Sequence, residues 1–158
     1  MEVVPVGSLK FKNEGVINDQ KFYVTAQDIL KDQGFSVMET AYIQFGGGNY
    51  HVEWVATKII DDYMSYRINI VLEFTGLADA TITKGGQQIK VRTGTISVEF
   101  NYSVLLDYLN KWTTGISKIV KPVYDKMNSE ALNSRKAELE REVQDIKAKM
   151  QNNISVAV

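Results

Sequence analysis

A hydrophobic period of two runs through most of residues 35–102 and restricts this chain to a fold built on a sheet. It is clearest at residues 64–75, where the odd positions are mostly polar and the even positions are Met64, Tyr66, Ile68, Ile70, Leu72 and Phe74. Successive side chains of a strand point to opposite faces, so this segment predicts a strand with one buried and one solvated face. A strand of a parallel sheet, buried on both faces, would not alternate in this way. We therefore expect an antiparallel sheet.

The same period predicts further strands at residues 3–12, 35–45, 50–60, 77–84 and 87–102. Between 35 and 45 the odd positions, Glu39 included, share one face. In the last strand the apolar parity changes near Gly94, where a β-bulge with Gly94 at positive φ would restore the facing. The triple glycine at 46–48 joins two expected strands, so it predicts a hairpin loop rather than a phosphate-binding loop.

Helical spacing replaces this period on both sides of the strands. Residues 18–33 predict a helix that Asn18 or Asp19 caps and Gly34 ends. An apolar stripe from residue 104 predicts a second helix, which Pro122 should kink or divide. Beyond residue 128 the chain is highly charged, and its apolar positions follow an a/d pattern for about three heptads.

These elements predict an α+β fold. A twisted antiparallel sheet of about five to six strands packs on a long C-terminal helix, with one short helix before the strand meander. We expect a globular domain over residues 1–127 and a charged, amphipathic helical extension over residues 128–158.

The element order, together with the glycine loop at 46–48, resembles the helix-grip fold of START and plant-allergen-type lipid- and hormone-binding domains. The resemblance covers residues 3–127. It implies a cavity between the sheet and the long helix for a small apolar ligand. The family usually has two short helices where this chain shows one, and six following strands where this chain shows five.

Composition excludes several kinds of chemistry. The chain has no Cys, which rules out disulfides, thiol catalysis and thiolate metal sites, and it has one His, which rules out sites with two imidazoles. Its net charge of −1 argues against a nucleic-acid-coating protein. No apolar run is long enough for a membrane span, so we expect a cytoplasmic protein, and no motif calls for a cofactor or metal. We expect His51 to be passive on the solvated face and Asp61-Asp62 to form a solvated turn.

Glu39 and Lys58 are unusual because each lies on an otherwise apolar strand face. In a hairpin whose paired residue numbers sum to 97 they are directly opposite, and at a sum of 95 they are diagonal. Such a pair could hold a polar ligand group, form a cross-strand salt bridge, or leave Lys58 to extend to the rim. With Trp54 and Tyr66, they are the candidate ligand-binding residues; core packing is the alternative for the two aromatic residues.

The a/d positions of the C-terminal segment are candidates for a partner interface: Leu132, Leu139, Val143, Ile146 and Met150. This seam could pack on the chain's own sheet or pair with another helix as a coiled coil. We favour the second, because a narrow stripe suits a helix better than a sheet. The sequence thus predicts a non-catalytic interaction module that self-associates or binds a partner protein through residues 132–150. The alternative is a carrier of a small apolar ligand; an enzyme has least support, since no acid, base and nucleophile converge.

Overall fold

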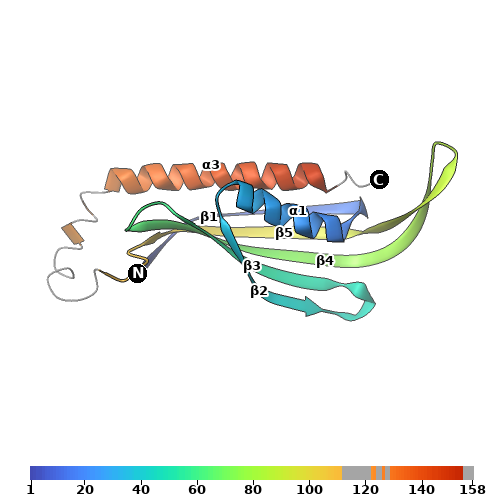
Figure 1. Ribbon diagram of the computed structural model, residues 1–158, viewed down its shortest axis with the longest axis horizontal. Helices are drawn as coiled ribbons and strands as arrows, with labels where there is room; N and C mark the ends of the chain where they lie inside the picture. Colours follow the sequence, from blue (N-terminus) through green and yellow to red (C-terminus); the bar gives the residue numbers. More distant parts are fainter. Residues whose placement is uncertain (112–121, 124–125, 127–128, 155–158) are drawn as a thin grey trace.

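The structure, a computed structural model, describes residues 1–111, 122–123, 126 and 129–154. It confirms the α+β class, with one five-stranded antiparallel sheet of order β1-β5-β4-β3-β2 (Figure 1). The elements are β1 (Glu2–Ile17), α1 (Asp19–Asp32), β2 (Ser36–Gln44), β3 (Tyr50–Ile59), β4 (Met64–Lys84), β5 (Gln87–Leu106) and α3 (Ser129–Asn153), with a 3-10 turn, η1 (Gly46–Gly48), between β2 and β3. β1 and β2 are therefore the edges of the sheet.

Helices α1 and α3 cover the same face of the sheet (Figure 1). The inward side chains of β4 confirm the predicted alternation, because Ile70 is 1% exposed while its neighbours Asn69 and Val71 are half-buried on the other face. The interior between the sheet and the helices is filled by large side chains, among them Trp54, Tyr66, Phe74, Phe100 and Tyr102.

Helix α1 begins and ends as its sequence predicts. The Asn18 side chain accepts a hydrogen bond from the Lys21 amide at 3.0 Å, which caps the first turn. Gly34 follows the last turn at φ +91°, a conformation that glycine adopts without strain. Phe22 of α1 packs edge-to-face against Phe74 of β4, which fixes the helix over the β3–β4 half of the sheet.

The two strands expected at 64–75 and 77–84 are one strand, β4, which forms a long hairpin with β5. The expected bulge lies at this level, but in β4, where the register shifts between Thr75 and Ala78. Gly94 faces the bulge from β5, and its φ is not positive. It is needed for a different reason, because a Cβ there would lie 2.8 Å from Leu77 Cδ2 and 3.0 Å from the Thr75 carbonyl oxygen.

The helix predicted from residue 104 is wrong in its first part. β5 continues to Leu106, where Val104 and Leu106 face the interior and pair with Tyr66 and Met64. The alternation of β5 and the apolar stripe share residues, so spacing alone could not separate strand from helix here. Residues 107–111, which follow β5, form a bend and a turn rather than a helix, and residues 112–121 of the predicted helix lie outside the described residues.

The prediction that the C-terminal helix lies outside the core is also wrong. Its seam residues Leu139, Val143, Ile146 and Met150 are fully buried in the same cluster as the strands, and Leu132 packs against that cluster. The reason is that two helices share one sheet face. α1 covers part of it, so α3 needs only a narrow apolar stripe to cover the remainder beside β1 and β5.

Candidate functional site

The structure divides the four predicted ligand-binding residues into two pairs. Glu39 lies opposite Trp54, and Lys58 lies opposite Tyr66. The predicted proximity of Glu39 and Lys58 is wrong. The residue numbers paired between β2 and β3 sum to less than either value that we considered, so Glu39 lies opposite a residue nearer the hairpin loop than Lys58. A bulge between Glu39 and Ala41 then changes the register again toward the loop.

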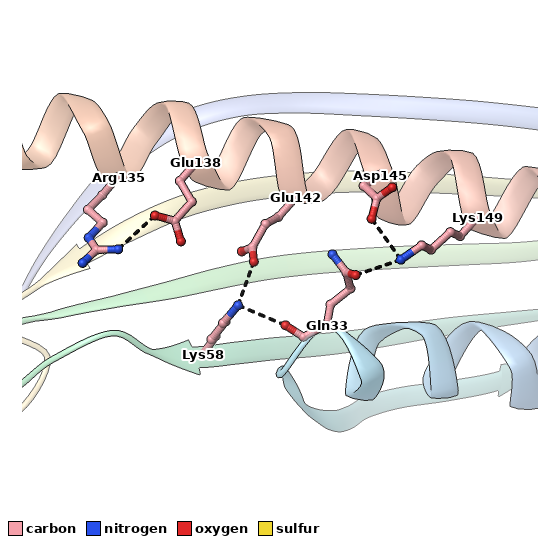
Figure 2. A network of polar contacts seen from close by, with 7 residues as sticks. All are labelled: Gln33, Lys58, Arg135, Glu138, Glu142, Asp145 and Lys149. Carbon is pink, nitrogen blue, oxygen red and sulfur yellow. Dashed lines mark hydrogen bonds and ion pairs between the residues drawn. The ribbon is translucent and has the colours of Figure 1, made fainter.

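Lys58 of β3 forms polar contacts with the end of α1 and with α3. Its Nζ donates to the Gln33 carbonyl oxygen at 3.0 Å and to Glu142 of α3 at 2.7 Å (Figure 2). Lys149, further along α3, donates to the Gln33 side chain at 2.9 Å and pairs with Asp145. Lys58 and Glu142 are 25% and 19% exposed, so Lys58 is an internal latch rather than a ligand-binding group.

Tyr66 and Trp54 are core residues, 0% and 1% exposed. Burial, reinforced by the nearby charge of Glu138, raises the pKa of Tyr66 to about 12. Neither ring has surface with which to contact a ligand, and Lys58 is only partly exposed, so Glu39 is the one exposed residue of the four.

A groove of about 330 Å³ opens beside Glu39, between α1 and β2. We call it the tyrosine groove, and its lining residues are Gln20, Tyr23, Val24, Glu39, Tyr42 and Tyr50. The α1 residues are spaced i, i+3 and i+4, which places them on one face of the helix. The bulge at Thr40 turns Tyr42 to the same side of β2 as Glu39, since both lie opposite buried residues of β3. Without this bulge the two side chains would lie on opposite faces.

The aromatic rings of the groove are held by stacking. Tyr50 stacks on Phe74 at 4.3 Å between ring centroids, and Tyr42 stacks on Tyr50 at 5.6 Å. Tyr42 is the outer member of this stack and is 48% exposed. Tyr23 packs edge-to-face on Trp54 at 5.4 Å on the α1 side. The rings are therefore fixed by the core before any ligand arrives.

Glu39 is a hydrogen-bonded carboxylate for which the described residues supply no basic partner. Its Oε1 accepts from the Tyr23 hydroxyl and from Trp54 Nε1, the latter at 3.3 Å. No Lys, Arg or His of the described residues forms an ion pair with it. Burial and the adjacent Glu39 raise the pKa of Tyr23 to about 12, so this phenol keeps its proton and donates a hydrogen bond to the carboxylate.

A second hollow, of about 350 Å³, lies on the other side of the α1 N-terminus, against the β4–β5 hairpin. Asp19 lines this second hollow and is 2% exposed. It accepts from the Tyr50 hydroxyl at 2.7 Å and pairs with Arg92 at 3.0 Å. Burial and the hydrogen bond to Asp19 raise the pKa of Tyr50 well above its ordinary value. The charge at Asp19 is thus already neutralised, unlike that at Glu39.

The polar residues His51 and Asp61, which the sequence analysis also considered, are bonded to neighbouring residues of the strand and the turn in which they lie. His51 lies on the outer face of the sheet as predicted, 3.2 Å from both Glu53 and Glu73. Asp61 Oδ1 accepts from the amides of Tyr63 and Met64, as expected of a turn. In the described part of the chain, no three His, Asp or Glu side chains are grouped so as to hold a metal ion.

The sequence reasoning missed the groove because it named none of Tyr23, Tyr42 and Tyr50 among the ligand-binding candidates. Tyr23 lies next to Phe22 of the apolar stripe predicted at 18–33 without belonging to it, and a single aromatic residue at the surface is by itself no signal of a site.

Comparisons with known proteins do not name the function. No family model and no curated protein sequence matches the chain. Among solved structures, TTHA0849 from Thermus thermophilus is similar at 10% sequence identity over 92% of this chain and 98% of that one, with a TM-score of 0.26. A likeness this weak supports no argument about the present chain. Across the described residues, no helix combines the length and apolar character that crossing a membrane requires.

Proposed function

We propose that this protein is a non-catalytic binding module whose ligand occupies the tyrosine groove. The observation that supports this is the juxtaposition of the half-exposed Tyr42, stacked on Tyr50, with a Glu39 carboxylate that has no ion-pair partner among the described residues. A concave site with aromatic walls and few polar groups is the usual form of a small-ligand site. Its volume of about 330 Å³ suits a small molecule or one group of a larger one.

The chemistry of the groove favours binding over catalysis. Glu39 has a phenol and an indole as hydrogen-bond donors, and the phenol of Tyr23 holds its proton well into the alkaline range. A hydrolase or transferase would need a nucleophile within reach of a base, together with a donor for developing charge. The lining hydroxyl that bonds to Glu39 is that of Tyr23, and its raised pKa keeps it in the weakly nucleophilic phenol form.

Partner binding through the α3 seam is less favoured. Exposing Leu139, Val143, Ile146 and Met150 to another helix would require α3 to leave the sheet. At about 1.5–3 kcal/mol for each side chain, this would cost about 6–12 kcal/mol, comparable to the whole stability of a typical domain. Self-association and a cytoplasmic location stay predictions. An apolar ligand between the sheet and α3 would have to displace side chains that fill that interior.

Ligand screening with a matched pair of variants tests the proposal. Tyr42 lines the groove, whereas Ile43 is its neighbour on the other face of β2, and both are 48% exposed. A panel of small cations, anions, neutral polar and apolar compounds is screened by thermal shift. We expect a compound that raises Tm in the parent protein and in Ile43→Ala but not in Tyr42→Ala. Equal responses of the two variants would place the ligand elsewhere.

A further inference from the structure

The charge balance of the tyrosine groove differs from that of the neighbouring hollow. Each has a carboxylate that accepts from a tyrosine hydroxyl, Glu39 from Tyr23 and Asp19 from Tyr50. Asp19 is paired with Arg92 at 3.0 Å, whereas Glu39 has hydrogen-bond donors but no basic side chain among the described residues. Both donors to Glu39 reach the same oxygen, Oε1, which leaves Oε2 with no partner that the structure shows. The groove therefore has an uncompensated negative charge at its wall.

The aromatic rings add to this negative potential. The ring face of an aromatic side chain carries negative electrostatic potential and attracts a cation within about 6 Å of its centroid. Tyr42 has one face against Tyr50 and remains 48% exposed, which leaves its outer face open. A group beside Tyr42 in the groove would contact this face and the Glu39 carboxylate together.

These features suit a weakly hydrated organic cation better than a metal ion. Mg²⁺ and Ca²⁺ require several oxygen ligands, and the groove offers one carboxylate. A substituted ammonium group loses little hydration and gains from the open ring face of Tyr42 and from the carboxylate. We infer that the tyrosine groove binds a small organic cation carrying an alkylated ammonium group, which lies between Glu39 and Tyr42. This inference rests on the proposed function and specifies its ligand class.

The test compares two compounds of nearly equal shape and different charge. Choline carries a quaternary ammonium group, and 3,3-dimethylbutan-1-ol replaces its charged nitrogen with carbon. Each is titrated into the protein at low ionic strength while NMR follows the ring resonances of the groove, with circular dichroism as a check of folding. We expect saturable choline binding that is at least tenfold tighter than binding of the neutral compound.

Variants then separate charge from shape. Glu39→Gln should weaken choline binding by about tenfold, and Tyr42→Leu by about three- to thirtyfold, whereas Ile43→Ala, on the other face of β2, should bind as the parent does. Two results would overturn the inference in distinguishable ways. If the neutral compound binds as tightly as choline and Tyr42→Leu weakens both equally, the groove is a binding site for uncharged ligands. If choline shows no saturable binding up to its solubility limit, the cation assignment fails whatever the other screens yield.

Discussion

Truncating Ile146 measures how much α3 contributes to the core. This residue is 0% exposed and packs in the cluster that joins α3 to the strands. Ile146→Ala removes three carbon atoms, or about 2.4 kcal/mol of transfer free energy at about 0.8 per carbon. The cavity left behind adds to this, so we expect a loss of about 2–5 kcal/mol in the free energy of unfolding. For a chain of this size that corresponds to a fall in Tm of roughly 4–20 °C.

The assay is urea unfolding followed by circular dichroism, with Gln144→Ala as the control. Gln144 is exposed on the same helix, and alanine keeps its helical propensity, so this change should shift stability by less than about 0.5 kcal/mol. Equal unfolding free energies for the two variants would refute the burial of α3. That result would restore the predicted extension over residues 128–158 as a helix independent of the core.

Three other changes probe the latch, the bulge and the tyrosines. Lys58→Met should lower the free energy of unfolding by about 1–3 kcal/mol, because it leaves Glu142 half-buried without its cation. Adding Glu142→Leu should recover most of this loss in a double-mutant cycle. If the double variant is no more stable than Lys58→Met, the proposed role of Lys58 is wrong. Gly94→Val should cost about 1–3 kcal/mol through crowding against Leu77 and the Thr75 carbonyl, and a neutral urea melt would argue against that contact. Stability should fall as the pH rises from about 10 toward 12, because the raised folded-state pKa values mean that the unfolded chain loses its phenolic protons first. The tyrosines concerned are Tyr23, Tyr50, Tyr66 and Tyr102. If the reasoning is wrong, an ultraviolet titration will show all tyrosines ionising together at the ordinary pKa, and melts at each pH will show no loss of stability in this range.

The parts of the fold that local pattern could predict are those with one dominant period. Helix α1 was predicted nearly to the residue, because its caps at Asn18 and Gly34 are local signals. The alternation of β4 identified its buried face. The end of β5 was mistaken for a helix, because Val104–Leu106 fits both periods and pairing with β4 decides between them.

Of the candidate site, sequence reasoning identified Glu39 and none of the tyrosines around it. The obstacle was the bulge at Thr40, which shifts the register of β2 by one residue and brings Tyr42 to the side of Glu39. The residue types around Thr40 do not by themselves predict a bulge there. It arises where two strands must match both a hairpin loop and a buried face, and those are tertiary constraints.

By itself, the sequence determined the α+β class, the antiparallel sheet and the position of α1, because hydrophobic period and capping residues act over a few neighbours. It also determined that α3 has one apolar stripe. Only the tertiary structure decided what that stripe contacts, because the area left uncovered on the sheet depends on where α1 lies. The same holds for Lys58, whose role follows from Glu142, a residue far along the chain that no local pattern connects to it.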